Sequence, residues 1–241
     1  MSYESKPRRV VIFGASSGIG LALCERYLAA RHHVIAHYWG NSQALESLSS
    51  KFEHLETLQL DLGDLTAVRE ATAGQRITSS DVVVFLGSLA RPTTIEDVDL
   101  DTLSRTINIG ALSNYVIMGA VGPAMVQRGW GRIVIGSSIG VKFGGGSDSF
   151  AYALANHTSE FIPRSARAWA ASNVLTNVVR IGVTETSLHD AFPGRNLTER
   201  TLQIPMQRMA STDEIADYVY WLGSDQNTYL TGQVTAISGG E

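Results

Sequence analysis

A glycine-rich turn between the first predicted strand and the first predicted helix is the strongest constraint on the fold of this chain. Residues 9–13 form a β-branched and aromatic run, an apolar helical pattern occupies residues 19–30, and residues 14–20 between them read GASSGIG. Glycines at such a junction let a phosphate approach the helix N-terminus, where free amides and the positive end of the helix dipole favour anions. Serine hydroxyls beside them add donors. The segment therefore predicts a strand–turn–helix unit that binds a dinucleotide.

The rest of the chain alternates strands with helices in the same way. Such alternation requires crossover connections and a parallel sheet. Predicted strands cover residues 9–13, 34–38, 55–60, 81–86, 132–135, 174–181 and 233–237, and predicted helices cover 19–30, 43–52, 65–73, 102–126, 150–171 and 212–222, with Thr212 as the N-cap of the last. The predicted fold class is α/β, a Rossmann-type doubly wound sheet of about seven parallel strands with helices on both faces.

Length and composition fit one globular domain spanning residues 1–241. The chain is 44% hydrophobic, and its formal net charge of −4 supplies no basic field for a nucleic acid partner. The single Cys24 excludes an internal disulfide and a cysteine-based zinc cluster, and we expect no bound metal. A polar start and the lack of an uncharged apolar run of about eighteen residues predict a cytoplasmic protein without a membrane span. Residues 184–209 are polar and long for a connection, which predicts a substrate loop or lid.

A set of motifs is spread along nearly the whole chain. The motifs are the Gly-x3-Gly-x-Gly turn at 14–20, Asp61, Asn108, the run GRIVIGSS at 131–138, Tyr152, Asn177 with Gly182, TGQ at 231–233, and the pair Gly239-Gly240. As an ensemble they resemble the short-chain dehydrogenase/reductase family, in the layout of its 3-oxoacyl-carrier-protein reductase branch. The resemblance implies a Rossmann fold, an NAD(P) cofactor, a small-molecule carbonyl substrate and a homo-oligomer, either a dimer or a tetramer.

The resemblance also implies which residues contact the cofactor. The glycine turn and its serines would hold the phosphates, the residues after the third strand would border the adenine, and later residues would lie near the ribose and the nicotinamide. The implied cofactor-binding residues are Gly14, Ser16, Ser17, Gly18, Ile19, Gly20, His37, Asp61, Leu62, Gly87, Thr184 and Thr186.

The end of the second predicted strand bears on the choice between NADP and NAD. An acid at this place binds the 2′-hydroxyl of the adenine ribose of NAD, but residues 37–42 read HYWGNS here. No carboxylate is present to repel a 2′-phosphate, and His37, Asn41 or Ser42 would have to hold it. The sequence therefore favours NADP and leaves NAD open.

The resemblance implies a proton-relay site built on Tyr152. In the family a tyrosine donates a proton to the substrate carbonyl oxygen as hydride arrives from the nicotinamide, and a serine holds that oxygen. The serine position falls on Ser138 when counted from residues 131–133, and on Ser137 when counted back from the following glycine; we prefer Ser138. Asn108 matches the family's helix asparagine, which helps to hold a water of the relay.

The main departure from the family pattern is Asn156, which stands four residues after Tyr152, where the family has lysine. That lysine lowers the tyrosine pKa and bonds the nicotinamide ribose, and a neutral amide can take over only the second role. Loss of the charge impairs alcohol oxidation, which needs the phenolate, more than carbonyl reduction, which needs the protonated tyrosine. Lys142 could supply another cation, although a solvated loop charge is the ordinary interpretation, and His157 lies about 100° away around the helix.

The expected function is NADP(H)-dependent reduction of a ketone to an alcohol, with Tyr152 as the acid. Two alternatives stay open: a dinucleotide-binding scaffold or regulatory subunit without turnover, and a reductase of a conjugated carbon–carbon bond. Arg180 is expected either to reach an anionic group or, as the ordinary alternative, to form a surface salt bridge. Pro163 is expected to kink or end the helix predicted over 150–171.

Overall fold

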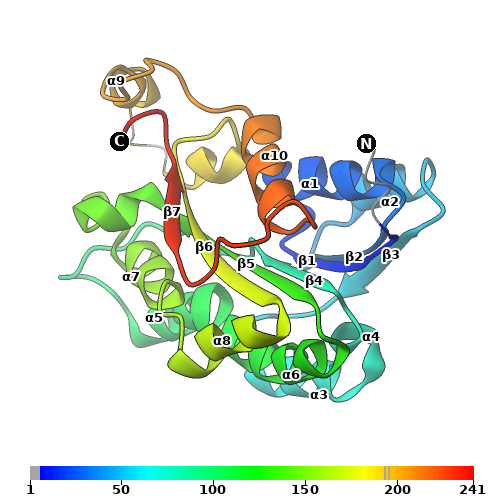
Figure 1. The fold of residues 1–241 in the computed structure, drawn as a ribbon. Coiled ribbons are helices and arrows are strands. Elements are labelled where there is room, and N and C mark those ends of the chain that lie inside the picture. Colours follow the sequence, from blue (N-terminus) through cyan, green and yellow to red (C-terminus); the bar gives the residue numbers. More distant parts are fainter. Residues whose placement is uncertain (1–5, 193, 195) are drawn as a thin grey trace.

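The computed structural model describes residues 6–192, 194 and 196–241, which form a three-layer α/β fold (Figure 1). The sheet has seven strands, all parallel, in the order β3-β2-β1-β4-β5-β6-β7. The strands are β1 (Arg9–Phe13), β2 (His33–Tyr38), β3 (Leu55–Gln59), β4 (Val82–Phe85), β5 (Gly131–Ser138), β6 (Val174–Ile181) and β7 (Val234–Ile237). The predicted doubly wound sheet is confirmed. The strand order reverses between β1 and β4, which is where such a sheet forms a crevice at its carboxyl edge.

Helices cover both faces of the sheet (Figure 1). One face carries α1 (Gly18–Ala29), α2 (Gln43–Ser49) and α10 (Thr212–Leu222), and the other carries α3 (Leu65–Ala73), α4 (Gln75–Thr78), α6 (Ser113–Arg128) and α8 (Arg164–Ala168). Two further helices, α5 (Leu100–Ile107) and α7 (Phe150–Ser159), pack against each other, and α7 also packs against β5.

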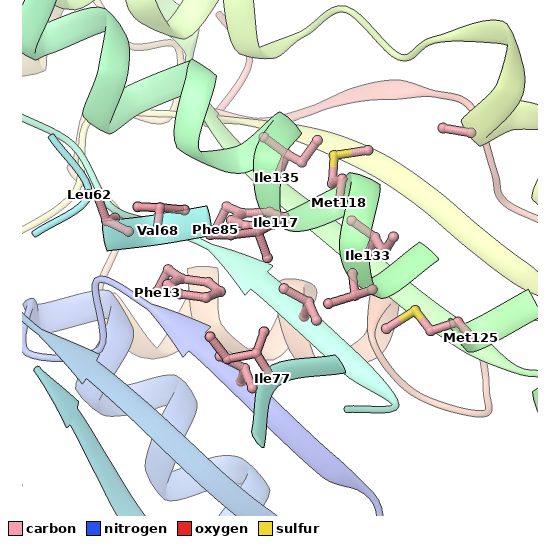
Figure 2. Close-up of a cluster of buried hydrophobic side chains, with 14 of the residues drawn as sticks. Phe13, Leu62, Val68, Ile77, Phe85, Ile117, Met118, Met125, Ile133 and Ile135 are labelled. Carbon is pink, nitrogen blue, oxygen red and sulfur yellow. The ribbon is translucent and has the colours of Figure 1, made fainter. Parts of the chain in front are cut away.

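The central strands are apolar on both sides because alternate residues enter different cores. Val10 and Ile12 of β1 are buried on the side of α1, whereas Val11 and Phe13 are buried on the side of α6. Phe13 stacks on Phe85 of β4 with the ring centroids 5.4 Å apart, within the cluster shown in Figure 2. Unbroken apolar strands predict this burial on both faces.

The helix predicted over 102–126 is one helical stretch from Leu100 to Arg128 with a change of winding inside it. A π turn at Asn108–Leu112 separates α5 from α6. Such turns are rare, occur mostly as single turns inside α-helices, and are frequent at functional sites. By length and composition this stretch could cross a membrane, but Ile117 and Met125 lie buried in the core, as expected of a core helix beneath a sheet.

The helix predicted over 150–171 is broken in the structure, as Pro163 implied. α7 ends at Ser159 and α8 begins at Arg164, directly after Pro163, and a 3-10 turn follows at Trp169–Ser172. Proline lacks the amide hydrogen that a continuous helix would need there and is tolerated at a helix start. The expectation that Pro163 kinks or ends the helix is therefore confirmed.

The segment predicted as a lid, residues 184–209, has local structure of its own. It contains a 3-10 turn at Ser187–Ala191 and the short helix α9 (Leu197–Leu202). Thr184 forms an isolated parallel bridge with Ala210, which joins the two ends of the segment. Residues 193 and 195 of this prediction lie outside the described part of the chain.

Candidate active site

A cleft of about 1010 Å³ opens at the carboxyl ends of the parallel strands. Because these ends meet at one edge of the sheet, residues far apart in the sequence converge there. The predicted residues that line the cleft are Ser17, Gly18, Ile19, Gly87, Ser137, Ser138, Tyr152, Asn156, Thr184 and Thr186. The predicted residues outside its lining are Gly14, Ser16, Gly20, His37, Asp61, Leu62 and Asn108.

Close backbone contacts shape the glycine turn. Gly14 has a φ of +80°, a left-handed conformation that glycine adopts without strain. A Cβ on Gly20 would lie 2.3 Å from the Gly14 carbonyl oxygen, so a larger residue does not fit. The Ser17 hydroxyl caps α1 by donating to that same carbonyl oxygen (2.8 Å) and accepting from the Gly20 amide (3.2 Å). The result is a helix N-terminus that opens onto the cleft through residues 17–19.

His37 lies behind the glycine turn and is 3% exposed. Its Nδ1 accepts a hydrogen bond from the Gly14 amide (3.0 Å), so the ring proton is on Nε2, which donates to the Leu60 carbonyl oxygen (2.8 Å). Burial lowers the pKa of His37 and keeps the ring neutral. The prediction that His37 holds a cofactor phosphate is therefore wrong, because both ring nitrogens are occupied by backbone groups that fix the turn.

Asp61 and Leu62 lie in the segment after β3, outside the cleft lining. Asp61 accepts two hydrogen bonds from Arg105 Nη2 (3.1 and 3.0 Å) and one from the Gly63 amide (2.8 Å). Leu62 is buried, and its Cδ1 would lie 2.7 Å from a Cβ on Gly87. Any adenine contact of Asp61 would therefore share the carboxylate with Arg105, a partner that sequence reasoning did not identify.

The two threonines predicted on the nicotinamide side line the cleft just after β6. The Thr184 hydroxyl donates to the Gly182 carbonyl oxygen (3.0 Å), and the Thr186 hydroxyl bonds the Thr184 carbonyl oxygen (3.5 Å). His189, which also lines the cleft, bonds the same Thr184 carbonyl oxygen through Nε2 (2.8 Å). These bonds order the start of the lid segment next to the strand ends.

The two serines at the end of β5 differ in their hydrogen bonds. Ser137 is 4% exposed, and its hydroxyl lies 2.7 Å from Glu160 Oε1. Because a carboxylate only accepts hydrogen bonds, the Ser137 hydroxyl is the donor. Ser138 Oγ accepts from the Gly140 amide (3.1 Å), which leaves its own proton for a group in the cleft. The geometry favours Ser138 as the serine that donates to a substrate oxygen.

Tyr152 and Asn156 lie one turn apart on α7, and both line the cleft. The Asn156 amide nitrogen donates to the Tyr152 carbonyl oxygen (2.9 Å), a bond within the helix. The side chain carries no charge, so Asn156 does not replace the ammonium group of the family's lysine.

Asn108 lies outside the cleft lining, and its role in holding a water of the relay stays a prediction. It begins the π turn, and its side-chain amide donates to the Gly63 carbonyl oxygen (3.1 Å) on the side of the β3 loop. Gly110, within the same turn, lines the cleft. Sequence periodicity assumes a regular α-helix and could not predict the π turn.

An ion pair whose acidic partner the sequence did not identify links the C-terminal end of α7 to β6. Arg180 donates from Nε to Glu160 Oε1 (2.8 Å) and from Nη2 to Oε2 (2.7 Å), and the Glu160 side chain is 8% exposed. The carboxylate raises the pKa of the Arg180 guanidinium. Arg180 also lies opposite Ser137 in the β5–β6 register, so the three side chains form one cluster. Of the two expectations for Arg180, the salt bridge is confirmed, with a buried carboxylate as its partner.

Two other residues, Lys142 and His157, were considered as cations that could take the place of the family's lysine, and they lie in different positions. Lys142 lines the cleft, with Nζ 5.4 Å from the centroid of the Phe143 ring, whereas His157 is exposed and outside the lining. Within the described residues, no group of three or more His, Cys, Asp or Glu side chains could hold a metal ion.

Two charged residues of the cleft lining were not selected from the sequence. Arg200 of α9 pairs with Glu241, which follows β7, and both line the cleft. Neither residue belongs to a motif, and only the fold brings the lid segment and residues 238–241 together.

Sequence comparisons identify relatives over the whole length of the chain. The family described as enoyl-(acyl carrier protein) reductase matches residues 14–241. The chain is 28% identical to the acetoacetyl-CoA reductase of an Acinetobacter species over 247 residues, covering 98% of each protein. It is 27% identical to the 3-oxoacyl-[acyl-carrier-protein] reductase of Salmonella typhimurium over 243 residues, covering 100% of this chain and 98% of that relative.

Solved structures have the same fold. A 3-oxoacyl (acyl-carrier-protein) reductase from Agrobacterium tumefaciens, solved with NADP bound, gives a TM-score of 0.89 at 24% identity and covers 100% of this chain and 98% of its own. A Beutenbergia cavernae protein solved with NADP at low occupancy gives 0.86 at 28% identity and covers 98% of this chain and 97% of its own. The chain therefore belongs to the short-chain dehydrogenase/reductase family of oxidoreductases.

Proposed function

We propose that the protein is an NADP(H)-dependent reductase that converts a ketone to an alcohol. The observation that carries this proposal is the convergence of Ser138, Tyr152 and the N-terminus of α1 in one cleft. Relatives named acetoacetyl-CoA reductase and 3-oxoacyl-[acyl-carrier-protein] reductase support it, as do neighbours solved with NADP.

The cleft offers donors and room for a dinucleotide. α1 is 12 residues long, and its N-terminus faces the cleft with Ser17 beside it, which suits a pyrophosphate. Gly87, Gly136 and Gly182 line the cleft near the ends of three strands and add no side chains there. The nicotinamide would lie toward Thr184 and Thr186, and bound NADPH would supply the hydride.

NADP is favoured over NAD because residues 39–42, directly after β2, include no carboxylate that would bind the 2′-hydroxyl of NAD. With His37 buried, Asn41 and Ser42 remain as neutral donors. Asn41 Oδ1 accepts a hydrogen bond from the Gln43 amide (2.9 Å), a bond that does not use the side-chain NH₂ group of Asn41. The Ser42 hydroxyl, in contrast, donates its proton to Glu46 Oε1 (2.5 Å). We infer a preference for NADPH that depends on Asn41 and on the missing acid.

Ser138 and Tyr152 both act on the carbonyl oxygen of the substrate. The Ser138 hydroxyl donates a hydrogen bond to the carbonyl oxygen, and Tyr152 transfers its proton to that oxygen as hydride adds to the carbon. Ketone, hydride and proton together give the alcohol, and solvent returns a proton to the tyrosine. The Asn156 amide oxygen is left to bond a ribose hydroxyl. Reduction suits this site because it starts from the neutral tyrosine.

Replacement of Tyr152 by phenylalanine tests the proposed acid. Positioned general acids contribute roughly 100-fold to 10,000-fold in rate, so we expect Tyr152→Phe to lower kcat for NADPH-dependent ketone reduction by about 100-fold or more. Tyr229→Phe is the matched control, because Tyr229 is 94% exposed and lies outside the cleft lining. A steady-state assay of NADPH oxidation with a panel of ketones measures kcat for both variants and the wild type.

Equal turnover by Tyr152→Phe and the wild type would contradict the tyrosine mechanism. Binding of NADPH without reduction of any ketone would favour the scaffold or regulatory alternative. Reduction of a conjugated carbon–carbon bond that survives Tyr152→Phe would favour the third candidate, because the demand on the tyrosine is weaker there.

We further propose that the protein is a cytoplasmic homo-oligomer, a dimer or a tetramer. Exposed apolar side chains near α5 and α7, among them Leu100 (78% exposed) and Phe161 (68% exposed), support an interface on this side. Light scattering coupled to size-exclusion chromatography tests it, and a monomer at micromolar concentration would contradict it.

A further inference from the structure

Glu160 lies outside the cleft lining but bonds a residue within it, Ser137. It directly follows α7, and its side chain is 8% exposed. Oε1 accepts hydrogen bonds from the Ser137 hydroxyl of β5 (2.7 Å) and from Arg180 Nε of β6 (2.8 Å). Oε2 accepts from Arg180 Nη2 (2.7 Å). One carboxylate therefore joins the end of a helix to two neighbouring strands through three charge-assisted hydrogen bonds.

The elements that Glu160 joins carry both groups that act on the substrate oxygen. Ser137 directly precedes Ser138 at the end of β5. Glu160 stands about two helical turns after Tyr152 and one turn after Asn156. The Ser137 hydroxyl also lies 3.5 Å from the Asn156 main-chain oxygen, so the strand end and the helix meet at this point. The Ser137–Glu160 bond thus links the strand that carries Ser138 to the helix that carries Tyr152.

The ion pair with Arg180 does not by itself explain the bond to Ser137. Arg180 belongs to β6, so the pair joins α7 to β6 and would do so without the serine. The Ser137 hydroxyl adds the connection to β5, the strand that ends in the cleft. Because Arg180 bonds both carboxylate oxygens, it fixes the acceptor that Ser137 uses.

We propose that Glu160 is a positioning residue for the reduction, and that through Ser137 it sets the spacing between Ser138 and Tyr152. The inference rests on the proposed ketone reduction, in which these two groups act on one oxygen atom. A displacement of a reacting group by about 1 Å can lower a rate by about 100-fold. A small shift of the strand end against the helix therefore slows the chemical step, although Glu160 itself does not touch the substrate.

Ser137→Ala separates this role from the ion pair. The substitution removes the hydroxyl that bonds Glu160 and leaves both bonds between Glu160 and Arg180 in place. We expect kcat for NADPH-dependent ketone reduction to fall by about tenfold, while the KM for NADPH changes less than about twofold. Ser80→Ala is the matched control and should keep the wild-type kcat. It removes another fully buried serine hydroxyl, at the amino end of β4 and outside the cleft lining.

Two substitutions of Glu160 test the carboxylate. Glu160→Met is similar in length but accepts no hydrogen bond, so we expect kcat to fall by about tenfold, as in Ser137→Ala. Glu160→Gln keeps an amide oxygen for Ser137 and should retain most of the wild-type kcat. Rates are compared at a temperature at which circular dichroism shows every variant to be folded, so a loss of stability alone leaves kcat unchanged.

The double variant Ser137→Ala/Glu160→Met tests whether the two residues act through one bond. If they do, its kcat is no lower than that of the slower single variant, because both substitutions remove the same hydrogen bond. Losses that multiply in the double variant would show two independent roles and overturn the inference.

The other outcomes separate the inference from the function on which it rests. A wild-type kcat in Ser137→Ala or in Glu160→Met would overturn the inference and leave the reductase proposal standing. A loss in Glu160→Gln as large as in Glu160→Met would also overturn it, because the charge and not the bond to Ser137 would then matter. If Glu160→Met does not fold, Ser137→Ala decides: a lower kcat supports the inference and an unchanged one overturns it. If the wild type reduces no ketone, the reductase proposal fails, and the inference fails with it.

Discussion

Asn156 determines how the proposed acid is supported, because it stands one turn from Tyr152 on α7 and lines the same cleft. Its amide bonds the Tyr152 carbonyl oxygen and brings no charge to the phenol. The resemblance to the family, which has lysine four residues after the tyrosine, pointed to this departure in the sequence. It could not predict the bond within the helix, because the rotamer of Asn156 depends on its neighbours in the fold.

Restoring the cation should change the two directions of the reaction unequally. In Asn156→Lys an ammonium beside Tyr152 favours the phenolate, and a pKa lower by one unit changes the phenolate fraction about tenfold near neutral pH. We expect alcohol oxidation with NADP⁺ to rise by about tenfold or more, and ketone reduction to stay equal or rise slightly. Initial rates in both directions at one pH measure this. A fall of oxidation in a folded variant would contradict the assigned role of position 156.

His37 should make stability depend on pH. Burial lowers its pKa below the ordinary value of 6.5, so the unfolded chain binds more protons than the folded one below that pH, and stability falls as the pH drops. Urea unfolding between pH 7 and about pH 5 should show this loss. His37→Gln should flatten the slope, with a remaining contribution from His32, whose pKa burial also lowers. Replacement of exposed His157 by Gln is the control, and an unchanged slope in His37→Gln would refute the account.

At the scale of elements, helix α7 and strand β6 are joined by the Glu160–Arg180 pair. Arg180→Met leaves the buried carboxylate of Glu160 without a cation, a change that destabilises proteins by about 3 kcal/mol. The reciprocal Glu160→Gln should destabilise less, because its amide can still accept from Arg180 and Ser137. Free energies of unfolding from urea titrations measure both variants. Equal stability of Arg180→Met and the wild type would contradict a structural role for the pair.

The limits of prediction for elements lie where backbone geometry departs from regular repeats. Strand positions and the range of α10 follow from the hydrophobic pattern, although the N-cap of α10 is Ser211, which forms a capping box with Glu214, and not Thr212 as predicted. The π turn at Asn108–Leu112 has no signal in a periodic pattern, and Asn108, at its start, lies outside the cleft lining. Pro163 did give a signal, and the helix ends before it.

At the scale of the whole molecule, the sequence predicts the parallel sheet and the glycine turn between its first strand and first helix. These follow because a strand–turn–helix unit and strict alternation leave few possible topologies. The sequence does not predict the Arg200–Glu241 pair, since its two residues lie 41 residues apart and come together only through the return of β7. Nor does it predict the burial of His37, which depends on packing against Phe13 and the β3 loop.

Calorimetric titration of the purified protein with NADPH and, in parallel, NADH shows whether the cleft binds a dinucleotide and which one it prefers. We expect one site per chain, with NADPH binding more tightly than NADH because no acid lies directly after β2, in residues 39–42. Binding of neither nucleotide would contradict the assignment of the cleft as a cofactor site, and with it the proposed reductase.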